Sequence, residues 1–296
     1  MFSNAPFQSI LFDNKTFIVK RDDLIHSKLN GNKAFKLAYL LDSELKTSNI
    51  TKLVSFGGCQ SNFMLALSRL AIIKGLQFDY WVRTLPKFLK ANPCGNLKSA
   101  LKDNMKLIER LRLPDITELH HHYNSDQTLI LDQGGRMPSA EYGMKRCAKQ
   151  IIDYTSAQGL TDYSVFVPSG TGTTAVYLAK YLPIDTLYTT PCIVDENDLK
   201  RQMQSLDIAA SSRVQILNPC REYRFGGLYF EHLALYQQLL SQTAIEFELL
   251  YDPQGWQVLL SYYDKLPKPV IYLHCGGTEG NETMLKRYRR NGMLKP

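Results

Sequence analysis

Lys33 stands near the start of a predicted helix, in residues 30–37 with the sequence NGNKAFKL. Asn30, Gly31 and Asn32 favour turns and helix N-caps, and an apolar pattern at helical spacing follows them. Lys33 is therefore expected in the first helical turn, where the positive end of the helix dipole disfavours an ammonium group. A lysine amine kept neutral in this way is a nucleophile, and the first chemistry to consider is Schiff-base formation.

Residues 165–175, with the sequence VFVPSGTGTTA, join a buried apolar strand to small hydroxyl residues and glycines, and a helical pattern follows. Successive backbone N–H groups in such a loop point at one spot, and the helix dipole and the hydroxyl groups add to their attraction for an anion. The loop lacks the Gly-Lys-Ser/Thr ending of a nucleoside-triphosphate site and the full Gly-x-Gly-x-x-Gly pattern of a dinucleotide site. We therefore predict a phosphate cradle of another kind.

The sequence GGCQSN at residues 57–62 directly follows the apolar run at 53–56. Its two glycines let the backbone come close to a ligand. Ser61 is a suitable N-cap for the next helix, and the free N–H groups at that helix start suit a carboxylate or a phosphate. The same pattern is also found at purely structural strand–turn–helix junctions, so the residues alone leave both interpretations open.

Apolar runs of β type alternate with helical patterns almost throughout the chain, which is typical of an α/β fold with largely parallel sheets. The predicted strands cover residues 17–20, 53–56, 78–82, 128–131, 165–167, 186–188, 214–217, 247–250 and 270–273. The predicted helices cover residues 33–46, 61–74, 97–111, 140–158, 174–182, 195–209, 231–242 and 279–290. No linker or repeat marks a domain boundary, so periodicity does not separate one domain from two.

The composition of the 296 residues is that of a globular protein, with 44% hydrophobic and 21% charged residues. No apolar stretch approaches the roughly 20 residues that a transmembrane helix needs, so no membrane partner is expected. The first six residues lack the features of a signal peptide. We expect a cytoplasmic protein.

Metal and nucleic-acid sites receive little support. The six cysteines are scattered without a Cys-x-x-Cys pair, which favours reduced thiols over a zinc ribbon or a disulfide scaffold. Residues 120–122 are three consecutive histidines, but neighbouring side chains on a strand point to opposite faces, and no acidic partner is suitably spaced. Of the positive charges behind the net +7, five lie in the last eleven residues, which is typical of a solvated helix end. No bound metal and no nucleic-acid partner are predicted.

Taken in order, four segments resemble the pyridoxal-phosphate-dependent family of 1-aminocyclopropane-1-carboxylate deaminase and D-cysteine desulfhydrase. These segments are 22–37, 57–62, 170–174 and 274–277. The resemblance implies fold-type II, the tryptophan synthase β-like fold, with two open and mostly parallel α/β domains and the cofactor in the cleft between them.

The resemblance also implies a division of the chain. The larger, cofactor-binding domain would consist of residues 1–51 and 151–296, with a smaller α/β domain, residues 52–150, inserted between them. Residues 131–136, with the sequence LDQGGR, resemble the glycine-rich stretch by which the family's chain returns from the smaller domain.

Four residues receive roles at the reacting end of the site from this resemblance. Lys33 would hold pyridoxal 5'-phosphate as a Schiff base and then act as the base at the substrate Cα. Asn62 would meet the phenolic oxygen of the cofactor. Ser61 would help to hold the substrate carboxylate, and Gln60 would line the substrate pocket.

The remaining implied contacts hold the rest of the cofactor. The phosphate ligands would be Gly170, Thr171, Gly172, Thr173 and Thr174. Lys36 would add a positive charge, with a solvated lysine as the alternative. Cys275 would lie near the pyridine nitrogen, where a neutral partner leaves the ring a weaker electron sink than an aspartate would; an ordinary buried cysteine is the alternative.

The chain departs from the family at two pocket positions. Phe63 stands where relatives usually have a polar Gln or His, so a polar substrate contact is expected to be missing. Gly255 stands where relatives commonly have a tyrosine that works beside the cofactor, and Tyr251 or Trp256 could fill the space. The missing tyrosine at 255 weakens the case for cyclopropane ring opening.

The function implied is deamination of a small amino acid, by β-elimination or ring opening, to an oxo acid and ammonia. The alternatives are an amino-acid racemase or another lyase on the same scaffold, or a catalytically altered protein that still binds pyridoxal phosphate. A homodimer is implied by the family resemblance alone. The reaction and the enantiomer do not follow from the sequence.

Overall fold

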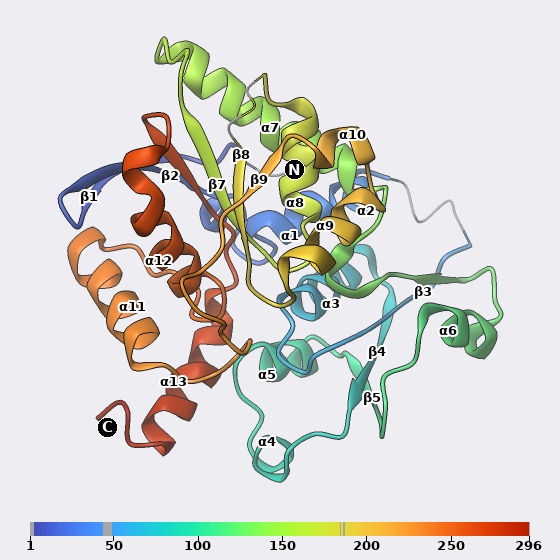
Figure 1. The fold of residues 1–296 in the computed structure, drawn as a ribbon. Coiled ribbons are helices and arrows are strands. Elements are labelled where there is room, and N and C mark those ends of the chain that lie inside the picture. The colour runs from blue at the N-terminus through green and yellow to red at the C-terminus, as the bar shows by residue number, and fades with distance from the viewer. Residues whose placement is uncertain (1–2, 44–48, 184, 186, 296) are drawn as a thin grey trace.

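The structure, a computed structural model, describes residues 3–43, 49–183, 185 and 187–295 (Figure 1). The strands of its larger sheet are β1 (Phe7–Phe12), β2 (Lys15–Arg21), β7 (Ser164–Ser169), β8 (Leu187–Pro191), β9 (Val214–Ile216) and β10 (Val270–His274). Those of its smaller sheet are β3 (Lys52–Phe56), β4 (Gln77–Arg83), β5 (Lys106–Arg110) and β6 (Thr128–Ile130). The strand orders are β1-β2-β10-β7-β8-β9 and β5-β4-β3-β6.

Every strand pair in the described residues is parallel except the hairpin of β1 and β2. In the larger sheet, β2 pairs with β10, so that Val19, from the first part of the chain, lies opposite Tyr272, from its last part. The predicted α/β class with mostly parallel sheets is confirmed. The predicted division into residues 1–51 with 151–296 and an insert of 52–150 stays a prediction.

Helices connect the strands. The α-helices are α1 (Gly31–Lys36), α2 (Ala38–Asp42), α3 (Asn62–Lys74), α4 (Lys87–Ala91), α5 (Gly95–Lys102), α6 (Ile116–Tyr123), α7 (Ala140–Ala157), α8 (Thr173–Tyr181), α9 (Glu196–Gln204), α10 (Ile208–Ser211), α11 (Phe230–Thr243), α12 (Asp252–Tyr262) and α13 (Asn281–Arg290). The 3-10 helices are η1 (Asp22–Leu24), η2 (Gln133–Gly135), η3 (Tyr263–Lys265) and η4 (Thr278–Gly280). None of the helices in the described residues has both the length and the apolar character that crossing a membrane requires.

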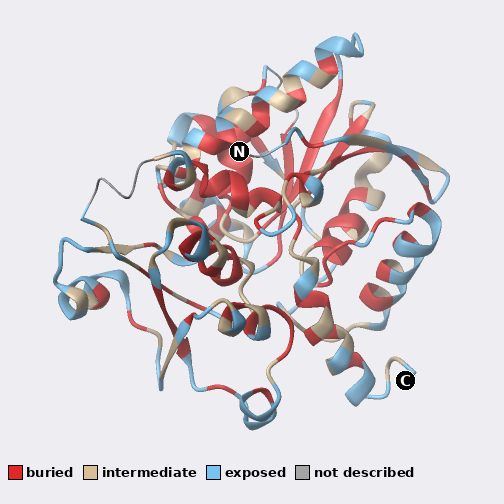
Figure 2. Ribbon diagram, turned by 180° about the vertical axis from the view of Figure 1, so that it is seen from behind, coloured by how far each residue is buried: buried red, intermediate tan, exposed pale blue. Residues whose placement is uncertain are grey.

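The larger sheet is covered on both faces, and alternate side chains of its central strands enter two different cores. In β7, Val165 and Val167 pack in the core that includes α7 and α8, whereas Phe166 packs in the core that includes α11 and α12. Figure 1 shows α11 and α12 on one side of the sheet and α7 and α8 on the other. Burial is concentrated in these central strands and the helices beside them (Figure 2).

The smaller sheet packs against α3 through β3 and β4, and its other face meets α6 in a cluster of Val54, Trp81 and Leu119. Asp115 and Glu118 form a capping box that starts α6. The consecutive histidines at 120–122 therefore lie on a helix and not on a strand. Within the described ranges, no group of three or more His, Cys, Asp or Glu side chains could hold a metal ion.

The strand predicted at 247–250 is wrong, because two carboxylates bind the backbone donors there. Glu248 accepts the N–H groups of Leu250 and Tyr251 at 2.7 and 2.8 Å, and Asp252 accepts the N–H of Glu248 at 2.8 Å. These donors are then unavailable for a sheet partner, and the chain passes directly into α12, which the periodicity did not predict.

Several other boundaries differ from the prediction. The helix expected at 97–111 ends at Lys102, and β5 follows it. The helices expected at 33–46 and 195–209 are each broken, into α1 and α2 and into α9 and α10, and residues 44–46 lie outside the described residues. The strand expected at 186–188 begins at Leu187, with residue 186 also outside the description. Strand β1 and helices α4 and α6 were not predicted.

Candidate active site

A cavity of about 440 Å³ is lined by segments that belong to both sheets. It is bordered by α1, the turn before α3, η2, the β7–α8 loop, the residues before α12, the loop after β10 and one face of α13. Every residue for which a site role was predicted lines it: Lys33, Lys36, Gln60, Ser61, Asn62, Gly170, Thr171, Gly172, Thr173, Thr174 and Cys275. The structure thus gathers into one cavity residues that are up to 242 positions apart in the sequence.

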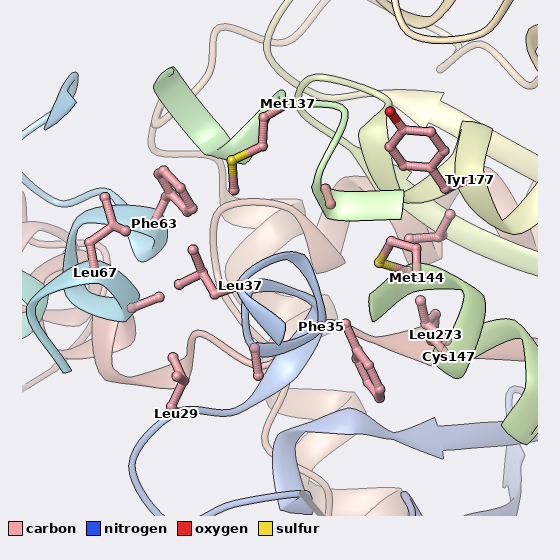
Figure 3. Close-up of a cluster of buried hydrophobic side chains, with 14 of the residues drawn as sticks. Leu29, Phe35, Leu37, Phe63, Leu67, Met137, Met144, Cys147, Tyr177 and Leu273 are labelled. Carbon is pink, nitrogen blue, oxygen red and sulfur yellow. The ribbon is translucent and has the colours of Figure 1, made fainter. Parts of the chain in front are cut away.

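Helix α1, which carries Lys33, is fixed by an apolar core between the two sheets. Figure 3 shows Phe35 and Leu37 among the side chains of that core, with Phe63 on one side and Met144 and Cys147 of α7 on the other. Helix α7 crosses α1 closely enough that a Cβ atom on Gly143 would lie 1.8 Å from the carbonyl oxygen of Phe35. This contact leaves α1 little freedom to move its lysine.

The Lys33 side chain is half-buried, and its amine is connected to the phosphate cradle by hydrogen bonds. Lys33 Nζ donates to Asn32 Oδ1 at 2.9 Å, and Asn32 Nδ2 donates to Thr174 Oγ1 at 3.1 Å. Burial lowers the pKa of Lys33 below its ordinary value, although the neighbouring Cys275 and Glu248 act in the opposite direction. A larger fraction of neutral amine follows, and its cause is burial rather than the helix dipole that the sequence suggested.

The cradle forms where β7 ends and α8 begins. Gly172 adopts a left-handed backbone with φ of 70° and packs so tightly that a Cβ atom would lie 2.3 Å from Met203 Cγ. The first intrahelical bond of α8 runs from Val176 N–H to Gly172 at 2.9 Å, so the N–H groups of Thr173 and Thr174 precede it. These donors are available to an anion in the cavity.

Lys36 and the return stretch at 131–136 close one side of the cradle. Lys36 Nζ donates to the Gly134 carbonyl at 3.1 Å, and a Cβ atom on Gly134 would lie 3.1 Å from Thr171 Cγ2. Burial and the nearby Lys33 hold the pKa of Lys36 well below its ordinary value. Lys36 is therefore a buried amine against the cradle rather than a solvated surface lysine.

Ser61 is the N-cap of α3, as predicted. Its side-chain oxygen accepts the N–H groups of Phe63 and Met64 at 3.2 and 3.3 Å. Asn62 is oriented by Asn96, whose Nδ2 donates to Asn62 Oδ1 at 2.7 Å and to the Gln60 carbonyl at 2.9 Å. With its oxygen occupied, Asn62 keeps its Nδ2 donor for a ligand. Asn96 is fully buried and was not identified from the sequence, because nothing in the sequence around it shows this long-range contact.

Cys275 lies beside α1. Its carbonyl accepts the N–H of Asn32 at 3.3 Å, and a Cβ atom on Gly31 would lie 2.0 Å from that carbonyl oxygen. Burial raises the pKa of the Cys275 thiol, so the side chain is neutral at physiological pH. It is a half-buried residue that lines the cavity and also packs against the core, and its role beside the pyridine nitrogen stays a prediction.

The two departures from the family pattern have physical consequences here. Phe63 is buried in the core and packs under Gly135, where a Cβ atom would lie 2.8 Å from Phe63 Cε2. Gly255 lies in α12, where it faces Pro168 and Tyr272, and it does not line the cavity. Of the two aromatic residues considered as substitutes, Tyr251 lines the cavity, whereas Trp256 is fully buried in the core.

Glu248 is the main residue of the cavity that sequence reasoning missed. Its side chain is buried, its Oε2 accepts two backbone N–H groups, and its Oε1 has no hydrogen-bond partner in the described part of the chain. Burial and the neighbouring Asp252 raise the pKa of Glu248 to about 8, although the backbone donors and Lys33 act against this shift. A protonated carboxyl at neutral pH would donate from Oε1 into the cavity.

Glu248→Gln should change how stability depends on pH. The folded protein keeps the Glu248 proton up to about pH 8, whereas the unfolded chain releases it near the ordinary pKa of 4.5. Stability therefore falls as pH rises through this window, and the glutamine variant lacks that loss. Urea unfolding of the cofactor-free protein at pH 5 and pH 9 should show the variant gaining on the order of 1–4 kcal/mol relative to wild type at the higher pH.

The exposed Glu222→Gln is a matched control and should leave the profile unchanged. A difference between wild type and Glu248→Gln that is the same at both pH values would contradict the assignment.

The cavity fits pyridoxal phosphate on the chemistry of its donors. The cradle offers N–H and hydroxyl groups for the phosphate, and a side chain at Gly134 would crowd Thr171 beside it. Lys33 could hold the aldehyde, Asn62 the phenolic oxygen and Cys275 the pyridine nitrogen. Glu248 Oε1 and Gln60 Oε1, which have no hydrogen-bond partner among the described residues, are further buried polar atoms that a cofactor or substrate would satisfy.

Comparison with known proteins gives a consistent set of relatives, although no family model matches the chain. A protein of Oryza sativa subsp. japonica, provisionally named D-cysteine desulfhydrase 2, mitochondrial, is 26% identical over 92% of this chain and 80% of its own length. A D-cysteine desulfhydrase of Serratia proteamaculans is 23% identical over 88% of this chain and 86% of its own length. A Thermotoga maritima protein provisionally named 1-aminocyclopropane-1-carboxylate deaminase is also 23% identical, over 88% of each chain.

Solved structures share the fold. The crystal structure of a homologue of 1-aminocyclopropane-1-carboxylate deaminase matches with a TM-score of 0.80 at 16% identity, over 99% of this chain and 94% of that one. The crystal structure of a threonine deaminase matches with a TM-score of 0.66 at 14% identity, over 93% of each chain. These matches show that the chain has the same fold as these two proteins.

Proposed function

We propose that the chain is a pyridoxal-phosphate-dependent lyase. The premise is that it belongs to the family of D-cysteine desulfhydrases and 1-aminocyclopropane-1-carboxylate deaminases. Its substrate is a small amino acid, which it deaminates to an oxo acid and ammonia. The observation that supports this most directly is the hydrogen-bonded connection from the Lys33 amine through Asn32 to the threonine-rich cradle. An amine and a phosphate site held at fixed separation suit one molecule that carries both an aldehyde and a phosphate.

The residues that line the cavity have separate roles in the proposed reaction. When bound, pyridoxal phosphate withdraws electrons from the substrate Cα and so acidifies the proton there. Lys33 Nζ takes up that proton, and its lowered pKa favours the neutral amine that this step needs. Ser61 and the Asn62 N–H, which comes before the two N–H groups that Ser61 caps, bind the substrate carboxylate. Asn62, held by Asn96, keeps its orientation through the reaction.

β-Elimination is favoured over ring opening, because residue 255, where relatives commonly have a tyrosine, is a glycine outside the cavity lining, and Tyr251, which does line the cavity, is at a different position. We also propose that residues 52–150 form the smaller domain, and that the protein is a cytoplasmic homodimer.

The purified chain, supplied with pyridoxal phosphate, should show the absorption band of a lysine-bound cofactor, and borohydride should fix the cofactor on the peptide that contains Lys33. Titration with D- and L-amino acids should then release ammonia and an oxo acid from at least one of them. Racemisation without ammonia would point to a different reaction on the same site. A spectrum unchanged by the cofactor would contradict the proposal.

A further inference from the structure

One face of helix α13 forms a wall of the cavity. Gly280, Thr283, Met284 and Arg287 line it, at spacings of three, four and seven residues that place them on a single side of the helix. At about 1.5 Å per residue, Gly280 and Arg287 are separated by roughly 10 Å along the axis. The cavity therefore extends along α13 beyond the space at its N-terminal end.

The N-terminal end of this face lies at the reacting groups. A Cβ atom on Gly280 would lie 3.7 Å from Glu248 Oε1 and 3.8 Å from Asn62 Oδ1, and one on Gly277 would lie 2.5 Å from Asn62 Nδ2. Long side chains on a helix lean toward its N-terminus, so the Arg287 guanidinium lies nearer to this end than its own Cα does.

Arg287 is a half-buried cation without an acidic partner. Among the described residues no carboxylate pairs with it, and its one side-chain hydrogen bond goes to the Met284 sulfur at 3.1 Å. Its neighbours on the cavity wall are Phe225, Gly226 and Leu250, none of which carries a charge. Burial and the adjacent Arg290 lower the pKa of Arg287, yet a guanidinium remains charged at neutral pH.

The other two cations of the cavity have different tasks. Lys33 and Lys36 are both amines whose pKa values are lowered by burial, and they donate to Asn32 Oδ1 and to the Gly134 carbonyl, respectively. Arg287 stands apart from them on α13. A charge that is partly desolvated and unpaired costs free energy, and an anionic ligand group would remove that cost.

We propose that Arg287 binds the side chain of the substrate, and that this substrate is an amino acid with a second anionic group beyond Cβ. This inference rests on the proposed function, since it assumes that the α-carboxylate and Cα occupy the Ser61 and Lys33 end. The anion is a carboxylate, sulfonate or phosphate, because each accepts hydrogen bonds from the planar guanidinium.

The test uses matched pairs of amino acids with the holoenzyme. Threonine is compared with 3-hydroxyaspartate, cysteine with S-sulfocysteine, and serine with O-phosphoserine, in both enantiomers, so that each type of anion has its neutral counterpart. Wild type should favour at least one acidic member. Arg287→Gln should lower kcat/KM for it by roughly 10- to 100-fold, mainly through KM, and leave the neutral member unchanged. Arg287→Glu should lower it further.

Arg289→Gln is the matched control, because it removes one charge from an exposed position of the same helix. It should leave the acidic preference intact.

Equal turnover of acidic and neutral members by wild type, or an equal loss for both in Arg287→Gln, overturns the inference alone. If no cofactor attaches and nothing is turned over, the proposed function fails. Thermal-shift binding of aspartate and glutamate then decides about Arg287 separately, since loss of binding in Arg287→Gln but not Arg289→Gln supports it and equal binding overturns it.

Discussion

Lys33→Ala should abolish covalent attachment of the cofactor and lower kcat by roughly 10³-fold or more. The substitution removes the only amine in the described residues that hydrogen-bonds to Asn32 at the cradle, and with it both the nucleophile and the base of the proposed reaction. The core around α1 contains Phe35 and Leu37 but not the lysine amine, so the fold should persist. Borohydride treatment followed by peptide mass analysis, and turnover at saturating cofactor, measure the two effects.

Lys36→Ala is the informative comparison. Lys36 is also a buried amine beside the cradle, but its Nζ donates to the Gly134 carbonyl. Its loss should weaken cofactor affinity while borohydride still fixes the cofactor on Lys33. Fixation on Lys36 in the Lys33→Ala variant, or turnover within tenfold of wild type, would show that Lys33 has been given the wrong role.

The parts of the site that the sequence predicts are those whose chemistry is local. A cradle of glycines and threonines between a strand and a helix carries its own N–H donors, so residues 170–174 can be identified without knowing what surrounds them. Ser61 is similar, because its N-cap bonds reach only two and three residues ahead. The alternation of apolar runs and helical patterns likewise predicts most strands of both sheets.

The role of Glu248 could not be predicted from the local sequence pattern. Residues 247–250 resemble a short β run, and an acidic residue within it suggests an exposed face. In the fold its carboxylate accepts two backbone N–H groups three residues or fewer away, and this capping offsets part of the cost of burying it. Two tertiary features distinguish this arrangement from an edge strand. Asp252 accepts the Glu248 N–H, and Glu248 lines the cavity.

The basic residues near the C-terminus also show that sequence patterns do not predict tertiary contacts. Their clustering indicates a solvated helix end, and this is correct for the exposed Arg289 and Arg290. It is wrong for Arg287, which is half-buried and lines the cavity. The helical period places Arg287 on one face with Gly280, but which face meets the cavity depends on packing against residues 225–250, far away in the sequence.

Gly31→Ala should destabilise the protein by roughly 2–5 kcal/mol and weaken cofactor binding. Gly31 has φ of 68°, in the left-handed region, which costs an alanine about 1–2 kcal/mol. The added Cβ atom would also lie 2.0 Å from the Cys275 carbonyl oxygen, so the backbone of one segment has to move. That movement would separate Lys33 from Cys275. Urea unfolding of the cofactor-free protein and cofactor titration of the folded variant measure the two effects.

Gly75→Ala separates the two contributions to this loss. Gly75 ends α3 with the same φ of 68°, but no atom lies within 4 Å of its added Cβ. It should cost only the conformational part, about 1–2 kcal/mol, and leave cofactor affinity unchanged. The excess loss in Gly31→Ala then measures how tightly the lysine segment is held against the loop after β10. Equal losses in the two variants, with unchanged cofactor affinity in both, would mean that this contact does not position Lys33.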